Sequence, residues 1–262
     1  MARLRLMAVL AHPDDESLGI GGTLAKYASE DVETFVLTAT RGDGGRYREY
    51  RPGDAQHPGA SALASIRERE LRAAAAALGV HDVALLDYRD QQLDRANPQE
   101  VISAIGDHLR RVRPHVVITF GPDGAYGHPD HIAICQFATA AVVAAADPQL
   151  AKLYYIAWPE STWAAYQSAL KKLTSTVDGV ERQVVPWPDW EITTEIDTRA
   201  FSRTVWQAIA CHESQMSIYT RLAQLPPEHA DALWGRQSFY RVFSRVNGGR
   251  ARETDLFEGV RT

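Results

Sequence analysis

The chain has 262 residues, which suits one large α/β domain, and its 45% apolar and 23% charged residues are typical of a soluble globular protein. The net charge of −5 gives no reason to expect a nucleic-acid partner. Two cysteines, Cys135 and Cys211, exclude a disulfide scaffold, so we expect two buried thiols. The N-terminal apolar run is too short for a signal peptide and no stretch approaches the length of a membrane span, so we expect a cytoplasmic protein without a membrane partner.

Strand and helix patterns alternate through the first two thirds of the chain. Gly79 stands where a C-terminal glycine cap belongs, and Asn97 followed by Pro98 marks a helix start. Nearly continuous apolar strands in a βαβα order predict an α/β fold, with a mostly parallel sheet covered by helices on both faces. In chain order, the predicted elements are a strand at 4–10, a helix at 21–30, a strand at 32–40, a helix at 61–78, a strand at 83–88, a helix at 98–112, a strand at 115–120, a helix at 129–146 and a strand at 153–158.

The last third of the chain is less regular. The pattern predicts a strand at 191–197, then a long helix at 198–220 with Asp197 as its N-cap. Residues 225–262 mix turn signals with short helical pieces. The region 154–190 is rich in Trp and Tyr, which fits either core packing or an apolar interface in a homo-oligomer.

Two segments near the predicted strand ends have a structural interpretation. The glycines of Gly19-Ile20-Gly21-Gly22 favour close packing of a helix start against the sheet over a dinucleotide site, because Leu24 stands where the fingerprint needs a small residue. The polar loop from Arg41 to Gly59 follows the second strand. Open parallel sheets bind ligands at that edge, so this loop is a candidate substrate lid.

Polar side chains crowd the ends of the first and fourth predicted strands. His12 and Asp15 follow the first strand, and His131 follows the fourth. Because the carboxyl ends of parallel strands meet at one edge of a sheet, the two clusters can come together. Two histidines and a carboxylate, with a position left open for water, are typical of catalytic zinc. We therefore predict His12, Asp15 and His131 as the metal ligands.

The neighbouring groups suit acid–base chemistry. Asp14 stands between two predicted ligands and can take a proton from an activated water. His128 can stabilise an oxyanion or protonate a leaving amine, and Asp130 can hold the required tautomer of His128. Tyr126 can offer its hydroxyl to the oxyanion. This set predicts a metal-dependent hydrolase.

At these residues the chain resembles the PIG-L/LmbE-like family of zinc-dependent N-acetylglucosaminyl deacetylases. The segment from Ala11 to Glu16 matches the family's AHPDDE signature, and the segment from His128 to His131 matches its HPDH signature. The resemblance implies a Rossmann-like, LmbE-like fold with one zinc ion per chain. It also implies the ligand set and roles given above, and a small N-acyl sugar conjugate as substrate, as in the deacetylases of mycothiol and bacillithiol biosynthesis.

The resemblance adds two substrate-contact candidates, Arg67 and Asp90. The alternatives are a helix-surface arginine paired with Glu70 and a plain turn aspartate. The chain departs from the family pattern at Asp43 and Glu213, where relatives often carry Glu and Arg, which leaves the substrate open. We expect one deacetylase domain over 1–262, in which 1–150 forms the α/β core with the metal site and 151–262 completes the substrate cleft.

Two other functions fit part of the same pattern. Two histidines and a carboxylate accept Fe²⁺ as well as Zn²⁺, and they are also the ligand set of non-haem Fe(II) oxygenases. A sugar-binding relative that has lost catalysis is the second alternative, although the presence of both Asp14 and His128 argues against it. We expect the histidines outside the two clusters to be surface or turn residues; these are His57, His81, His108, His115 and His229.

Overall fold

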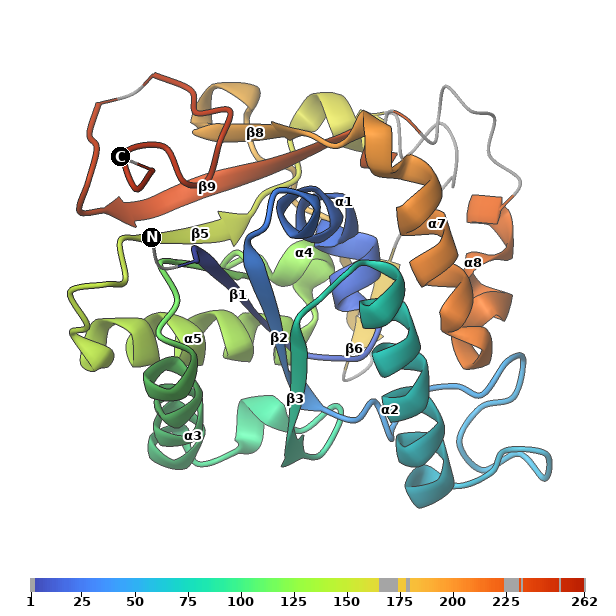
Figure 1. Cartoon of the computed structure of the whole chain (residues 1–262). Helices are drawn as coiled ribbons and strands as arrows, with labels where there is room; N and C mark the ends of the chain where they lie inside the picture. Colours follow the sequence, from blue (N-terminus) through green and yellow to red (C-terminus); the bar gives the residue numbers. More distant parts are fainter. Residues whose placement is uncertain are drawn as a thin grey trace.

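A seven-stranded sheet with the strand order β3-β2-β1-β4-β5-β9-β8 forms the centre of the molecule (Figure 1). The computed structural model describes residues 3–164, 174–177, 180–223, 231, 233–249 and 251–261. The strands of the sheet are β1 (Arg5–Leu10), β2 (Glu33–Thr40), β3 (Asp82–Tyr88), β4 (Val116–Thr119), β5 (Lys152–Ile156), β8 (Thr194–Asp197) and β9 (Arg236–Ser244). A separate hairpin pairs β6 (Thr174–Val177) with β7 (Val180–Gln183).

Helices cover both faces of the sheet, as the alternating pattern predicts. α1, α2 and α7 pack together on one face, while α3 packs against α5 on the other (Figure 1). The helices are α1 (Asp15–Ser29), α2 (Ala60–Ala77), α3 (Pro98–Val112), α4 (Gly124–Gly127), α5 (Pro129–Ala145), α7 (Ser202–Cys211) and α8 (Met216–Ala223), with short 3₁₀ segments η1 (Leu93–Arg95), η2 (Asp189–Glu191), η3 (Arg199–Phe201) and η4 (Glu213–Gln215). None of the helices among the described residues is long and apolar enough to cross a membrane.

The direction in which the chain adds strands to the sheet reverses between β1 and β4. From β1 the chain builds outward through β2 to β3, and it then returns to place β4 on the other side of β1. These strands and β5 are parallel, and the residues of β1 from Leu6 to Leu10 are fully buried because both faces are covered. At such a switch point two loops diverge and leave a crevice beyond the strand ends.

The C-terminal third differs from the prediction at two places. β9 pairs antiparallel with both β5 and β8, where we predicted only turns and short helical pieces. The predicted helix over 198–220 is instead interrupted: η3 precedes α7, and the chain leaves the helix at His212 before η4 and α8. Asp197 accepts a hydrogen bond from the backbone N–H of Arg199 at 3.1 Å, but Thr198, not Asp197, is the N-cap residue of η3. The long-helix prediction was wrong because buried contacts of His212 and Ser214 stabilise the break.

The first helix begins at Asp15, not at Gly21, so the glycine segment lies inside α1. A Cβ at Gly22 would stand 2.6 Å from the Cβ of Thr198, which precedes η3. The tightest packing of these glycines is therefore against Thr198 in the C-terminal portion of the chain, while Gly19 faces Ile156 of β5 at an ordinary contact distance of 3.6 Å. Because α1 begins directly after β1, the acids of its first turn lie at the edge of the sheet.

Other local predictions are confirmed with small shifts. Asn97 accepts a hydrogen bond from the N–H of Gln99 at 3.0 Å, and Gly79 has the positive φ of +73° that a C-terminal cap requires. Cys135 is buried as predicted, but the prediction of a buried thiol is wrong for Cys211, which is only half-buried. In the aromatic region Trp163 is buried and Trp190 is 77% exposed, so core packing accounts for part of it.

Candidate metal and catalytic centre

The turn from β1 into α1 places the first polar cluster. Asp14 has φ of 110°, a left-handed value that is unfavourable for a residue with a side chain. The Oδ2 atom of Asp15 accepts the backbone N–H groups of Ala11 at 3.2 Å and His12 at 2.8 Å, which closes the turn. The other oxygen of Asp15, Oδ1, faces His131. One carboxylate thus both shapes the turn and offers a ligand atom.

The three predicted ligands converge. His12 Nδ1 lies 3.1 Å from His131 Nε2, and Asp15 Oδ1 lies 3.5 Å from the same nitrogen. His12 Nδ1 and Asp15 Oδ2 are 3.8 Å apart. Ligands about 2.1 Å from a tetrahedral zinc ion are about 3.4 Å from one another, so these separations fit one small cation. The nitrogens of His12, His128 and His131 also lie within 4.8 Å of one another, so His128 borders the same point.

Carboxylates surround His12 on the side away from the metal position. Its Nε2 lies 3.0 Å from Asp90 Oδ1 and 3.1 Å from Asp130 Oδ2. Burial alone would lower the pKa of the His12 ring, but the negative charges of these two residues and of Asp15 raise that pKa well above its ordinary value. Such partners orient a ligating imidazole and strengthen its donor atom. The donor set therefore fits a metal ion.

Asp130 was predicted to hold His128, and this is wrong. Its carboxylate contacts His12 and accepts the backbone N–H groups of Gln91 at 2.7 Å and Leu93 at 3.0 Å. His128 is held instead by the backbone of Asp130, whose N–H donates to His128 Nδ1 at 3.2 Å. The tautomer is still fixed, with the proton on Nε2. Burial and the charge of His12 lower the pKa of His128 to about 4, so at neutral pH it is a neutral hydrogen-bond donor.

Asp14 is held by two side chains from distant parts of the chain. Its Oδ2 accepts a hydrogen bond from Arg67 Nη2 at 2.9 Å and from the hydroxyl of Tyr219 at 2.7 Å. Among the described residues no hydrogen bond reaches its other oxygen, Oδ1. One carboxylate oxygen is thus fixed while the other can accept a proton.

The Tyr126 ring lies beside the histidines, 5.9 Å from His128 and 5.4 Å from His131 between ring centroids. Burial and the neighbouring carboxylates raise the pKa of the Tyr126 phenol, so it remains a hydroxyl. The backbone before it is strained, since Ala125 has φ of 62°. Tyr126 is therefore where the sequence predicts it, next to His128.

Arg67 is buried and is not paired with Glu70, which excludes the surface-arginine alternative. Its guanidinium donates to the carbonyl oxygens of Gly42, at 3.1 Å, and Pro13 as well as to Asp14. Asp90 is likewise buried against His12, and its Oδ2 accepts the N–H of Gly44 at 3.1 Å. In this structure Arg67 thus contacts Asp14 and Asp90 contacts His12, and contact with a substrate remains a prediction for both.

The sequence analysis missed Tyr219 and His212 as members of the centre. Tyr219 lies on α8 and reaches Asp14, and nothing in its local sequence marks it. His212 Nε2 lies 2.8 Å from Glu16 Oε1, and the segment around His212 had been noted only as a variant of a late family motif. Of the described histidines outside the two clusters, His57, His108 and His115 are half-buried and His81 is exposed, as predicted. His229 lies outside the described residues.

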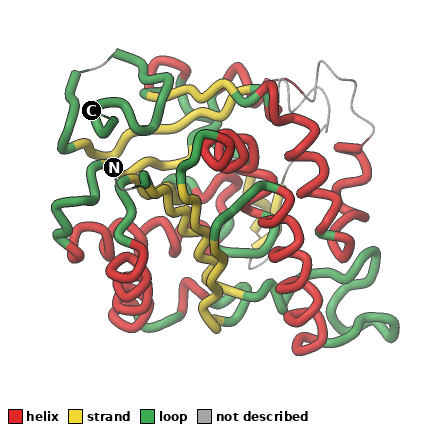
Figure 2. The backbone as a smooth tube through the Cα atoms, viewed as in Figure 1, coloured by secondary structure: helices red, strands yellow, loops and turns green. Residues whose placement is uncertain are grey.

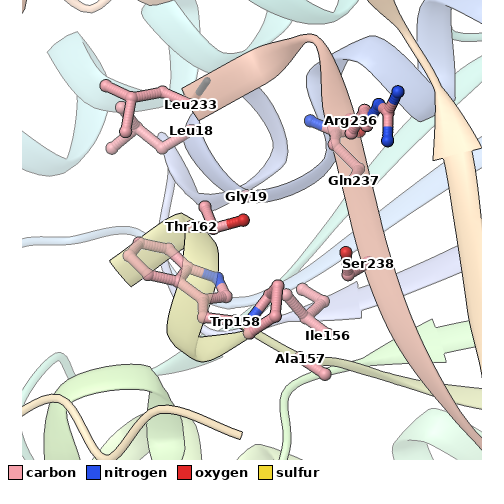
Figure 3. A pocket seen from close by; sticks show the side chains of 11 residues that line it. Leu18, Gly19, Ile156, Ala157, Trp158, Thr162, Leu233, Arg236, Gln237 and Ser238 are labelled. Carbon is pink, nitrogen blue, oxygen red and sulfur yellow. The ribbon is translucent and has the colours of Figure 1, made fainter. Parts of the chain in front are cut away.

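A small cavity lies beside the start of α1, between the ends of β5 and β9 (Figure 3). Its volume is about 30 Å³, room for a water molecule but not for a sugar. Leu18, Trp158 and Gln237 are among the residues that line it, and none of the predicted metal ligands does. This cavity is not the catalytic centre.

An α/β sheet with a cluster of histidines and carboxylates at its switch point is typical of a metal-dependent hydrolase. The family model PIG-L, described as GlcNAc-PI de-N-acetylase, matches residues 7–142. The chain belongs to this family of deacetylases, and it is an amide hydrolase.

Known relatives extend the similarity along the chain. The 1D-myo-inositol 2-acetamido-2-deoxy-alpha-D-glucopyranoside deacetylase of Kineococcus radiotolerans is 34% identical, covering 98% of this chain and 83% of that protein. Among solved structures, the 4-carboxy-2-hydroxymuconate hydratase GalB of Pseudomonas putida KT2440 has a TM-score of 0.67 and 18% identity, over 95% of this chain and 100% of its own. The N,N'-diacetylchitobiose deacetylase of Pyrococcus horikoshii has a TM-score of 0.61 and 21% identity, over 91% of this chain and 83% of its own. These likenesses show the fold, which hosts a hydratase as well as deacetylases.

Proposed function

We propose that the protein is a zinc-dependent deacetylase that removes the acetyl group from a small N-acetylglucosamine conjugate, with N-acetylglucosaminyl-inositol as the first candidate. The convergence of His12, Asp15 and His131 beside Asp14 carries the proposal. The full-length similarity to a deacetylase of an N-acetylglucosaminyl inositol supports the substrate class. The two alternatives, a non-haem iron oxygenase and a sugar-binding protein without catalytic activity, are not favoured. The relatives described above include neither kind of protein.

His12, Asp15 and His131 would hold the zinc ion. When bound, zinc polarises the acetyl carbonyl and lowers the pKa of a water molecule toward about 7. Asp14 has one oxygen fixed by Arg67 and Tyr219, and we propose that its other oxygen accepts the proton of the attacking water. The same proton then passes to the nitrogen of the departing sugar amine, and the products are acetate and a free amine.

We propose that the oxyanion formed from the acetyl carbonyl receives hydrogen bonds from Tyr126 and from Nε2 of His128. Both groups are neutral donors at pH 7 in the surroundings described above. Neutral donors fixed in a buried site stabilise developing charge without the desolvation cost of an added cation. Because His128 is neutral at pH 7, its role is that of a hydrogen-bond donor, and Asp14 delivers the proton to the leaving amine.

The substrate cleft would be completed by the C-terminal portion, residues 151–262, which already supplies Tyr219 to the centre. The loop from Arg41 to Gly59 forms no helix and extends past the start of α2 (Figure 2), and we retain it as the candidate lid. Arg67 and Asp90 would act on the substrate chiefly through Asp14 and His12. We place the enzyme in the cytoplasm, with a homo-oligomer as the candidate assembly.

The test is acetate release by purified protein from a panel of N-acetylglucosamine conjugates, with one equivalent of zinc and with a chelator. We expect release that the chelator abolishes and zinc restores. Asp14→Asn should bind zinc normally and lose at least about 100-fold in kcat, the contribution of a general base. Release that does not depend on metal, or a near-normal rate in Asp14→Asn, would contradict the proposal. Oxygen consumption with a 2-oxo acid would favour the oxygenase instead.

A further inference from the structure

The break after α7 buries an imidazole beneath the first turn of α1. His212 leaves the helix with ψ of 58°, and both His212 and Glu16 are 0% exposed. Nε2 of His212 lies 2.8 Å from Oε1 of Glu16, although 196 positions separate the two residues. Among the described residues Nδ1 of His212 has no hydrogen-bond partner, so the polar contacts of this ring are concentrated on Glu16.

Glu16 connects this pair to Asp14. Its second oxygen, Oε2, accepts the backbone N–H of Asp14 at 2.9 Å, while Oε1 also accepts the hydroxyl of Ser17. Asp14 is the residue with the left-handed φ of 110°. A strained backbone persists only where its surroundings over-determine it, and the hydrogen bond to Glu16 is such a constraint. The His212–Glu16 pair therefore acts on the peptide group whose side chain is the proposed base.

The pair has the geometry of a buried ion pair. Nε2 of His212 and Oε1 of Glu16 lie 2.8 Å apart, and both side chains are 0% exposed. Glu16 thus combines an imidazole partner with its hydrogen bond from the Asp14 N–H. Charge-assisted hydrogen bonds are shorter and about twice as strong as neutral ones, which favours a fixed position for Asp14.

We propose that His212 and Glu16 are positioning residues for the deacetylation reaction, which hold the Asp14 peptide so that its free carboxylate oxygen faces the reacting water. The inference rests on the proposed role of Asp14 as base. It also gives a purpose to the sequence Cys211-His212-Glu213-Ser214-Gln215, which the metal site does not explain. Ser214 in the same turn binds Glu70 on α2 through its N–H and its hydroxyl, at 2.7 and 2.6 Å, so the turn is anchored independently of His212.

A second buried carboxylate offers a matched control. Glu253 is 1% exposed and pairs with Lys152, the first residue of β5. Because β5 is parallel to β4, its first residue lies at the edge of the sheet opposite the metal ligands. Glu16→Leu and Glu253→Leu both remove a buried carboxylate with a cationic partner, but only Glu16→Leu releases the Asp14 peptide.

The experiment measures kcat, KM, zinc content and Tm for Glu16→Leu, His212→Leu, His212→Gln and Glu253→Leu, well below each Tm. For the first two we expect kcat to fall by about 10- to 100-fold with KM and zinc content within about two-fold of wild type, as a misplaced catalytic group would produce. His212→Gln keeps a donor at a similar reach and should recover most of kcat. Glu253→Leu should lower Tm and leave kcat unchanged.

Glu16→Asp provides a test if the leucine variants do not fold. It retains the charge but withdraws the carboxylate from the Asp14 N–H by one methylene, and we expect the same selective loss of kcat. If Glu16→Asp and His212→Leu have the kcat of the wild type while Asp14→Asn is inactive, the positioning role of the pair is wrong. The proposed function of the protein would then still hold. An equal loss of kcat in Glu253→Leu would also overturn the positioning role, by assigning the effect to stability. A near-normal rate in Asp14→Asn would instead remove the base assignment itself.

Discussion

The orientation of the His12 ring depends on residues that lie outside the sequence motif of His12. Its Nδ1 points to His131, while Asp90 and Asp130 fix its other nitrogen. Neither acid is close to His12 in the sequence. The orientation of this predicted metal ligand is therefore set by the turn after β3, which holds Asp90, and by the first turn of α5, which holds Asp130, and not by the AHPDDE segment alone.

Asp130→Asn tests this arrangement. Replacing one of the two carboxylates at His12 Nε2 should weaken zinc affinity by about 10- to 100-fold, the usual cost of losing a partner of a ligating histidine. A competition titration against a metal-binding dye measures the affinity, and kcat at saturating zinc should change less. If affinity is unchanged while the pH dependence of kcat shifts, Asp130 acts on His128, as the sequence alone suggested.

Arg67 gives a second prediction at this scale. Arg67→Met leaves Asp14 buried without its cationic partner and should lower the free energy of unfolding by about 3–5 kcal/mol. Arg72→Met, on the same helix, is the control, because Arg72 forms an exposed pair with Glu68 that is worth at most about 0.5 kcal/mol. Urea denaturation of both variants measures the difference. If both variants lower the free energy of unfolding equally, Arg67 contributes no more to stability than an exposed charged residue does.

At the scale of elements, local patterns predicted the parallel half of the sheet and its helices. They succeeded because apolar strands, the Asn97 cap and the Gly79 cap are each determined by neighbours in sequence. The break at His212 and the strand β9 were missed because both depend on distant partners. His212 is held by Glu16, and β9 is held by β5. Residues 198–220 contain neither Gly nor Pro, so no residue in this helical pattern indicates a break.

The packing of α1 against the C-terminal portion can be tested at one glycine. A Cβ at Gly22 would meet the Cβ of Thr198 at 2.6 Å, closer than real side chains approach. Gly22→Ala should therefore destabilise the protein by about 1–3 kcal/mol, despite the better helix propensity of Ala. Gly19→Ala in the same helix, with its nearest contact at 3.6 Å, should be neutral or stabilising by up to about 1 kcal/mol. Thermal unfolding of the two variants distinguishes them, and equal stability would contradict the close packing.

At the scale of the whole molecule, Glu253 binds the segment that follows β9 to the sheet. Its buried carboxylate accepts hydrogen bonds at 2.7 Å from the side chains of Lys152, Tyr154, Thr194, Arg241 and Asn247. Burial would raise the pKa of Glu253, but these donors lower it to about 2. The network therefore joins β5, β8 and β9 into one unit.

This shift predicts a pH dependence of stability. A carboxylate whose pKa is lower in the folded state stabilises the fold above its ordinary pKa of about 4.3, and that stability is lost as the pH falls toward 2. Glu253→Gln should therefore be less stable than wild type at pH 7, and the difference should shrink between pH 5 and pH 2. Urea denaturation of both proteins over this range measures it. A difference that is constant with pH would mean that the charge of Glu253 contributes nothing.

The residues of the candidate site that could be predicted from the sequence are those that directly follow the end of a strand. His12, Asp15 and His131 could be named from the sequence because two compact motifs fix them near the switch point of the sheet. The partners of the proposed base could not be recognised as such, since Arg67 and Tyr219 reach Asp14 across the fold and His212 acts on it only through Glu16.

The same separation gives the site an order of assembly during synthesis. Every predicted metal ligand lies in the first half of the chain, up to His131, whereas His212 and Tyr219 leave the ribosome much later. A growing or truncated chain can present all three ligands before it possesses the groups that orient Asp14. Capture of an ion by the predicted ligands thus requires the chain only as far as His131, whereas the orientation of Asp14 requires it as far as Tyr219.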